Sequence, residues 1–467
     1  MKNAILFFDD FMLKEYTGVR KRFFTGKQIS VMPPETPGQL SGGIIYHPPT
    51  NTYRLWRPTI TFDTLKGATK IIVYESSDLL NWERIPDHCL SGMELLKQDG
   101  HISRDDFEPD TEKRYKLNRI IREPGKKGNG YLSFSPDGLH WHYDKEYQFC
   151  SHLSDAANRT FYNPVLGEYE TILRASHVDR RVFCIYSDDM INWTRPRCIL
   201  MTRPSEEPCV EYYGLTPFPQ EGYFLGFAYK YFPPMFDTGH KKTAGNTDSY
   251  LVYSYDGNYW TFVSETPIVE RPLPPHHGCN GIYLNSLDVA PAKKNWILAG
   301  DLRRGDHGAD VRQEDTEAGL YGIARQEGLS ALGIYSIRRE GFVAYESTAR
   351  KALMTFHRIV MHGDDLFFNI SAPIGWIRFQ ISDKDGVIPG FTFDDCIPFN
   401  EDDQIRYRPV WKERDIQELK GQSIFVQVQM YTALIFAVMG DFYVQPGTFP
   451  MISLGDPRLP EQGVDMT

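Results

Sequence analysis

Residues 135–141 read Ser-Pro-Asp-Gly-Leu-His-Trp, and this spacing of Ser, Asp and Trp occurs four times in the chain. The other copies are Ser76-Asp78-Trp82, Ser187-Asp189-Trp193 and Ser254-Asp256-Trp260. Each copy follows a β-rich run, which predicts a hairpin whose turn is closed by Ser and Asp side chains bonding backbone N–H groups, with the Trp packed beneath. Because these aspartates recur in every copy, we interpret them as structural and not as catalytic residues.

A second recurring unit lies upstream of each hairpin and consists of a strand, a Pro-containing turn and another strand. It covers residues 43–57, 107–119, 161–174 and 213–228. Two strands and a hairpin give four strands at a period of about fifty residues, the size of a β-propeller blade. A fifth, degenerate copy without the Ser-Asp-Trp turn covers residues 281–300, 322–325 and 334–342. We therefore predict five blades, with the strand near Ala4–Phe8 free to close the ring.

The pattern changes after Glu346, where strands near 352–356, 366–370, 376–382, 424–430 and 435–442 predict a β-sandwich. The predicted fold class is thus all-β. It comprises a five-bladed β-propeller at residues 1–346, a β-sandwich accessory domain at 347–445 and an extended C-terminal tail at 446–467. If the protein forms a homo-oligomer, we expect the subunits to contact one another through the accessory domain or the tail.

Composition and charge limit the classes of molecule that the protein is expected to bind. The 467 residues include 14% aromatic residues, 38 Gly and 31 Pro, as an all-β chain with many turns requires. The net charge is -10 and no long basic run occurs, so we expect no nucleic-acid partner. Met1–Asp10 does not read as a signal peptide, and no segment has the length of a membrane helix. Seven Cys residues without any CxxC pair favour reduced thiols, and we expect a cytoplasmic protein without a zinc site.

The repeated turns, such as that of Ser135–Trp141, followed by a C-terminal sandwich resemble the five-bladed propeller glycosidase superfamily, which includes glycoside hydrolase families 32, 43, 68, 117 and 130. The C-terminal sandwich is similar to the layout of family 32, whose members process fructans. The family 32 motifs Asn-Asp-Pro-Asn-Gly and Arg-Asp-Pro do not occur in this sequence. The Glu-Cys motif of that family has only a partial match, Glu207-Pro208-Cys209. The resemblance implies a glycan-handling propeller with its site in the funnel at one end of the central axis.

Cleavage of a glycoside needs a carboxylic acid as proton donor and a carboxylate as nucleophile or base. The funnel is lined by residues just before the innermost strands, and acidic residues occur there. Asp155 and Glu211 are the preferred catalytic pair, with Asp106 as a third group and Glu207 as the substitute for Glu211. A solvated surface role is the alternative for each of them.

The ends of the second strands supply further candidates for substrate binding. Arginines stand at comparable places in three blades, where guanidinium groups could bind a carboxylate, sulfate or phosphate of the substrate or neutralise the rim aspartates. The predicted binding residues are Arg57, Arg119, Arg174, Asn158, His277, Asn280, Asp301 and His307. No phosphate loop, Ser-His-Asp signature or metal-ligand spacing is present, so no cofactor and no metal is predicted.

The sequence thus predicts a glycoside hydrolase acting on a small oligosaccharide or glycoside, such as a fructoside, an arabinoside or an anionic sugar. Two alternatives stay open, a non-catalytic glycan-binding propeller and an inverting glycoside phosphorylase.

Overall fold

The computed structural model describes residues 3–32, 44–59, 70–92, 101–121, 128–151, 158–174, 179–207, 209–220, 222–233, 245–288, 294–305 and 330–445. Within these ranges the regular elements are β-strands and three short 3-10 turns, η2 (Asp87–Cys89), η4 (Thr111–Lys113) and η5 (Ile416–Leu419). The predicted all-β class is confirmed. Over the same ranges, no helix is long and apolar enough to cross a membrane.

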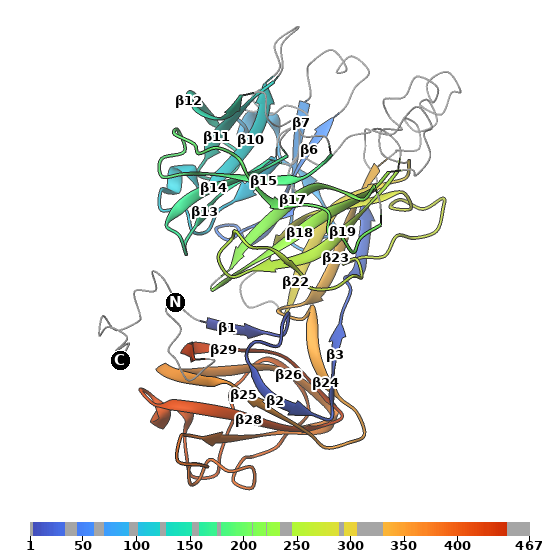
Figure 1. Cartoon of the computed structure of the whole chain (residues 1–467). Helices are drawn as coiled ribbons and strands as arrows, with labels where there is room; N and C mark the ends of the chain where they lie inside the picture. Colours follow the sequence, from blue (N-terminus) through green and yellow to red (C-terminus); the bar gives the residue numbers. More distant parts are fainter. Residues whose placement is uncertain are drawn as a thin grey trace. The chain divides into compact units, whose positions relative to one another are not determined.

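The chain forms two compact units. Unit 1 comprises Met1–Phe24, Gln220–Tyr223 and Arg338–Thr467, and unit 2 comprises Thr25–Pro219 and Phe224–Ile337. Unit 2 contains three four-stranded sheets and one eight-stranded sheet (Figure 1). The eight-stranded sheet divides into two groups of four strands at a single parallel bridge. We interpret the five groups found among the described residues as blades 1 to 5 of the propeller.

The blades have the following strands. Blade 1 contains β5 (Ile44–His47), β6 (Thr52–Thr59), β7 (Lys70–Ser76) and β8 (Glu83–Arg84). Blade 2 contains β9 (His101–Arg104), β10 (Tyr115–Ile121), β11 (Asn129–Ser135) and β12 (His142–Ser151). Blade 3 contains β13 (Arg159–Asn163), β14 (Glu168–Leu173), β15 (Val182–Ser187) and β16 (Arg197–Leu200). Blade 4 contains β17 (Glu211–Gln220), β18 (Tyr223–Phe232), β19 (Asn246–Ser254) and β20 (Thr261–Phe262). Blade 5 contains β21 (Gly281–Asp288), β22 (Asn295–Arg303), β23 (Ser330–Arg338) and β4 (Lys27–Met32).

The hydrophobic core of unit 2 lies between successive blades, because each sheet is apolar on both faces. Separate buried clusters join blade 1 to blade 2, blade 2 to blade 3 and blade 3 to blade 4. A further cluster joins blade 5 back to blade 1 and includes Ile297 and Leu332 next to Ile44 and Leu55. Blades 4 and 5 are joined by a parallel bridge between Thr247 and Gly281. The blades therefore follow one another around a ring, as in a β-propeller.

The ring is closed by a different strand from the one predicted. β4 supplies the outermost strand of blade 5 by pairing with β23, with Met32 opposite Leu332. The strand predicted near Ala4–Phe8 is β1 (Asn3–Leu6), which pairs with a strand of unit 1. That prediction was wrong because the sequence pattern indicates only that a strand forms. An apolar strand can make its backbone hydrogen bonds equally well in a propeller blade or in the sandwich.

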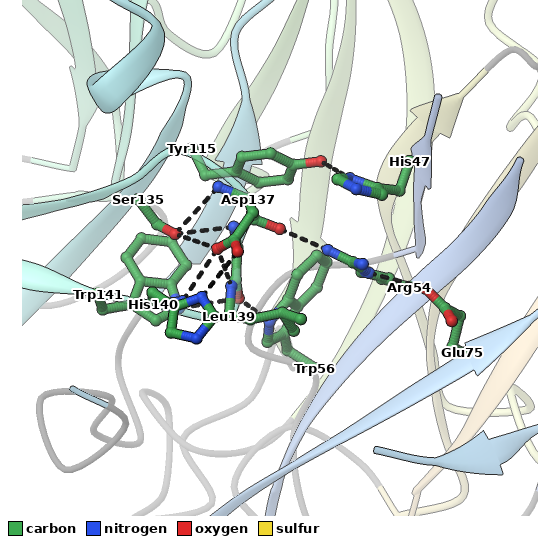
Figure 2. Close-up of polar contacts among 11 residues, drawn as sticks. His47, Arg54, Trp56, Glu75, Tyr115, Ser135, Asp137, Leu139, His140 and Trp141 are labelled. Carbon is green, nitrogen blue, oxygen red and sulfur yellow. Dashed lines mark hydrogen bonds and ion pairs between the residues drawn. The ribbon is translucent and has the colours of Figure 1, made fainter. Parts of the chain in front are cut away.

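The repeated turn has the predicted structure (Figure 2). Ser135 Oγ accepts a hydrogen bond from the backbone N–H of Gly138 at 2.8 Å. One carboxylate oxygen of Asp137 accepts from the N–H groups of Leu139 and His140 at 2.8 and 3.0 Å. Burial opposes ionisation of Asp137, yet these bonds lower its pKa to about 2. The structural role of the motif aspartates is confirmed by the same bonds at Asp78, Asp189 and Asp256.

These turns also connect neighbouring blades. Figure 2 shows Arg54 and Trp56 of β6 reaching the turn of blade 2, where they donate to the carbonyl oxygens of Asp137 and Gly138 at 2.6 and 2.9 Å. Gly138 has a φ of +80°, and a Cβ there would lie 2.7 Å from the Trp56 ring. Only glycine fits this close contact without strain.

Unit 1 is a β-sandwich built on one long strand, β26 (Arg358–Ser382). Residues 358–371 of β26 pair with β29 (Ala433–Gln445), and residues 376–382 pair with β28 (Ser423–Tyr431). The remaining strands are β1 (Asn3–Leu6), β2 (Leu13–Thr17), β3 (Val19–Phe23), β24 (Val343–Ser347), β25 (Ala352–Phe356) and β27 (Phe399–Tyr407). The two predicted strands at 366–370 and 376–382 are thus parts of one bent strand.

The predicted domain boundaries of 346 and 445 stay a prediction, and the contacts group the chain differently. Residues 1–24 and 338–346 belong to unit 1, because β1, β2, β3 and β24 pair within the sandwich.

Candidate functional site

The innermost strands β13, β17 and β21 begin at one end of unit 2, which we call the rim. Their antiparallel partners β14, β18 and β22 return to the same end, since Arg159 lies opposite Ile172 and Gly281 lies opposite Arg303. Polar side chains at the first residues of one strand and the last residues of the next therefore meet at the rim.

Blade 3 carries three arginines side by side at the rim, which we call the arginine row: Arg159, Arg174 and Arg180. Arg159 begins β13, Arg174 follows β14 and Arg180 precedes β15. The register places Arg159 opposite Ile172, and side chains two residues apart share a face. This face packs on blade 4, because Ile172 shares an apolar cluster with residues of β17. The three arginines therefore start from the same face of the sheet, and the guanidinium groups of Arg174 and Arg180 reach Tyr213 of blade 4.

The side chains of blade 4 that meet the arginine row are aromatic and acidic. The Arg174 guanidinium lies 4.4 Å from the centre of the Tyr213 ring, and that of Arg180 lies 4.6 Å from the Tyr231 ring. Arg180 also forms an ion pair with Glu211 at 2.5 Å. Since Glu211 and Tyr213 are two residues apart on β17, they occupy the same face.

Arg159 reaches further inward than its two neighbours. Its guanidinium donates to the backbone carbonyls of Ile102 in β9 and Asn285 in β21, at 2.7 and 2.8 Å. It therefore joins the innermost strands of blades 2, 3 and 5, which places it at the centre of the ring. Only 7% of Arg159 is exposed, and burial lowers its pKa to about 10, so it remains a cation at neutral pH.

Blade 5 completes the cluster with Tyr283, Asp301 and Arg303. The Tyr283 ring centre lies 6.0 Å from that of Tyr213, and the Tyr283 hydroxyl bonds with Thr247 at 2.8 Å. Asp301 is directly opposite Tyr283 and lies 3.7 Å from the Arg303 guanidinium. Burial raises the pKa of Tyr283, so its hydroxyl stays protonated. We call the arginine row together with Glu211, Tyr213, Tyr231, Tyr283, Asp301 and Arg303 the rim cluster.

Several predicted site residues belong to this cluster or to its support. Glu211, Arg174 and Asp301 are members. Asn280 precedes β21 and donates its side-chain N–H to the Arg304 carbonyl at 2.6 Å, which fixes the start of blade 5. Asn158 is fully buried beside Arg159, and His277 is half-buried in the loop before β21.

Other predicted residues cannot be placed in the cluster. Asp155 and His307 lie outside the described residues, as does the side chain of Arg57, whose backbone in β6 pairs with Ile72 of β7. Glu207 is exposed in the loop before β17. Their roles stay predictions.

The position predicted for Asp106 was wrong. The innermost strand of blade 2 is β9 (His101–Arg104), and not the predicted strand at 107–109, so Asp106 follows an innermost strand and does not precede one. It lies at the end of its blade opposite to the one where Glu211 begins β17. There it is exposed and pairs with Arg104 at 2.8 Å. Asp106 is therefore not brought together with Glu211.

Arg119 also differs from its prediction as a substrate ligand. It is buried, and its guanidinium stacks on Tyr143 of the outer strand of blade 2 at 3.9 Å. Burial lowers the pKa of Arg119. The side chain packs the blade and does not line the rim.

The sequence prediction missed Arg159, Arg180, Tyr213 and Tyr283. Nothing local distinguishes them, because the strands that carry them come together only through the register. The available signal in the sequence was that Arg159 and Phe161 lie two residues apart, which places them on the same face of the predicted strand.

The same face of β14 carries a buried acid at the other end of the blade. Glu170 is fully buried, where it accepts from the Asn163 side chain and from Cys184 Sγ. Burial raises the pKa of Glu170 to about 7, and the charges of Glu168 and Asp256 act in the same direction. Because the pKa is raised above that of the unfolded chain, ionisation disfavours the folded state, and stability falls as the pH rises from about 4.5 to 7.

We expect Glu170→Gln to raise the free energy of unfolding at pH 8 by about 3 kcal/mol relative to wild type, and to have little effect at pH 4.5. Urea unfolding at both pH values measures the difference. Glu83→Gln, an exposed acid on β8, is the control and should show no such pH dependence. Equal stability of Glu170→Gln and wild type at pH 8 would contradict the raised pKa.

No protein-family model and no curated protein sequence matches this chain. Solved structures that are similar to it include a glycoside hydrolase, with a TM-score of 0.42 at 12% identity over 69% of this chain and 93% of that chain. A β-1,2-mannobiose phosphorylase from Listeria innocua has a TM-score of 0.43 at 11% identity, over 66% and 94%. A fructofuranosidase variant from Schwanniomyces occidentalis has a TM-score of 0.41 at 9% identity, over 89% and 97%.

Proposed function

We propose that the propeller cleaves a small glycoside at the rim cluster. The observation that carries this proposal is Glu211, a carboxylate oriented by Arg180 on the same strand face as the Tyr213 ring. Aromatic rings stack on the apolar faces of sugars, and a fixed carboxylate supplies the base or nucleophile that glycoside cleavage needs. The combination of both in one rim favours glycoside chemistry over other hydrolytic reactions.

The roles follow from the charges around each group. An ion-paired carboxylate acts in its ionised form, so we assign Glu211 as base or nucleophile. Asp155, four residues before Arg159 in the sequence, remains the proposed proton donor. The sugar would lie against Tyr213 and Tyr283, with Asp301 accepting from its hydroxyl groups.

Phosphorolysis is the second candidate, because the arginine row is suited to bind inorganic phosphate as well as a substrate group. In that reaction phosphate attacks the anomeric carbon, and a single protein carboxylic acid protonates the leaving oxygen. Glu211 would then have no catalytic role of its own.

The test is a screen of the full chain against aryl glycosides and oligosaccharides of both anomeric series, with and without inorganic phosphate. We expect release of the aglycone or of free sugar, and phosphate-independent turnover identifies a hydrolase. Turnover that requires phosphate and yields sugar 1-phosphate identifies a phosphorylase. Binding of sugars without turnover of any compound would overturn the enzymatic proposal in favour of a glycan-binding propeller.

A further inference from the structure

Arg159, at the centre of the ring, is a cation whose hydrogen-bond partners are both neutral. Its guanidinium donates to the backbone carbonyl oxygens of Ile102 in blade 2 and Asn285 in blade 5. More than nine-tenths of the residue is buried, and within the described ranges it forms no ion pair. Burial of a cation is costly unless an opposite charge is close, and two carbonyl dipoles offset only part of that cost.

The titratable groups next to Arg159 are also neutral at pH 7. Tyr229 of blade 4 donates its hydroxyl hydrogen to the Leu284 carbonyl, and burial raises the pKa of Tyr229 to about 12. His101 of β9 is the other neighbour, and its pKa is lowered to about 3 by burial and by the charge of Arg159. The phenol and the imidazole therefore supply no negative charge to balance Arg159.

Three further polar atoms lie next to the two carbonyls that hold Arg159. They are Nδ1 of His101, Oγ of Ser103 and Oδ1 of Asn285, each buried and without a hydrogen-bond partner in the described part of the chain. His101 and Ser103 are on either side of Ile102 in β9, and residues two apart share a face of a strand. Asn285 occupies a bulge of β21. Buried polar atoms are normally bonded to protein, water or ligand.

From these observations we propose that Arg159 and these three side chains bind a small monovalent inorganic anion of the halide class, such as chloride. A guanidinium has five N–H donors, and the two carbonyls account for two hydrogen bonds. The Ser103 hydroxyl and the His101 ring N–H supply further donors, and the Asn285 amide presents its NH2 group after rotation. The ion balances the charge of Arg159 and links blades 2, 3 and 5.

The class of anion follows from the charge and the burial of Arg159. One cation balances one negative charge, which favours a monovalent ion over sulfate or phosphate. Only 7% of Arg159 is exposed, which favours a small ion over a carboxylate carried on a sugar. A water molecule at the same place would satisfy the polar atoms but would leave the charge uncompensated. The site does not involve Arg174 or Arg180, whose guanidinium groups contact Tyr213.

The first experiment locates the ion in the wild-type protein. Crystals of the full chain are grown in sodium bromide and, as a reference, in sodium gluconate, whose anion is larger than a halide. Anomalous diffraction at the bromine absorption edge then shows where bromide binds. We expect a peak within hydrogen-bond distance of the Arg159 guanidinium in the bromide crystals. Electron density of an ordered water there in both crystals, without an anomalous peak, would overturn the proposal.

The second experiment measures the effect of the ion in solution. Thermal unfolding of wild type is compared in sodium chloride, bromide and gluconate at equal ionic strength. We expect Tm to be about 3 °C higher at a saturating halide concentration, because an ion that binds the folded state stabilises it. Arg181→Gln is the control, since Arg181 pairs with Asp179 and not with the groups around Arg159, and it should keep the full effect.

Two variants assign the halide effect to this site. Arg159→Met should abolish the difference between halide and gluconate. Ser103→Ala removes one donor and no charge, so it keeps the test valid where the arginine variant does not fold. We expect it to raise the halide concentration for half-maximal stabilisation by about tenfold, as the loss of one hydrogen bond to a charged group implies.

The outcomes are distinct. A bromide peak beside Arg159 together with a halide effect that Ser103→Ala weakens supports the site. An equal halide response in wild type and Ser103→Ala overturns it. A peak without any halide effect on Tm means binding at crystal concentration only and also overturns it. None of these measurements involves turnover, so each result leaves the proposed glycosidase to its own test.

Discussion

Replacement of Glu211 by Gln is expected to lower kcat by about 1,000-fold or more on any glycoside that the wild type cleaves, with the fold retained. Gln has nearly the same shape as Glu but carries no negative charge, so it can neither attack the anomeric carbon nor activate water. The side chain is half-buried beside Arg180, and its removal creates no cavity. The loss should therefore appear in kcat rather than in stability.

Steady-state kinetics with a thermal melt of each variant measure this result. Glu83→Gln on β8 is the control and should retain full activity. Glu207→Gln tests the alternative that the exposed loop before β17 supplies the carboxylate. Loss of activity in Glu207→Gln with full activity in Glu211→Gln would transfer the role to Glu207.

The second large effect concerns a buried charge cluster in blade 2. Lys116 is completely buried and lies 2.7 Å from carboxylate oxygens of both Asp105 and Glu108. Those carboxylates also accept hydrogen bonds from Tyr162 N–H and the Tyr169 hydroxyl of blade 3. Lys116→Met removes the cation and leaves two carboxylates buried without it, which should cost about 3–5 kcal/mol.

Urea unfolding at pH 7 measures this loss. Lys113→Met, three residues away and partly exposed, is the matched control, where we expect a loss below about 1 kcal/mol. Adding Asp105→Asn and Glu108→Gln to Lys116→Met should recover much of the stability, because no uncompensated charge then remains. Wild-type stability of Lys116→Met would show that the cluster does not hold blades 2 and 3 together.

The fold could be predicted from the sequence where it depends on local bonds. All bonds that close a Ser-x-Asp turn join residues at most three apart, as in the bond from Gly138 to Ser135, so the motif and the turn correspond directly. The prediction failed at Phe107, whose apolar side chain beside Pro109 indicated a strand. In the structure, Asp105 accepts from the Phe107 N–H and begins a turn, because its carboxylate is also held by Lys116.

The site was less predictable for a related reason. Glu211 and Arg174 were found because each lies at a strand end, which a single repeat reveals. Arg159 and Arg180 were not, because their importance comes from the register of three strands and not from their neighbours in sequence. A search for like charges at the ends of successive strands that meet at the rim would have found the row.

The closure of blade 5 by β4 has a consequence for how the protein forms in the cell. Met32 pairs with Leu332, so the ring cannot close until residue 332 has left the ribosome, three hundred residues after Met32. Until then, β4 and the edge of blade 1 remain available to other chains, and such edges are sites of aggregation. Contacts between residues so far apart in sequence also make folding slow.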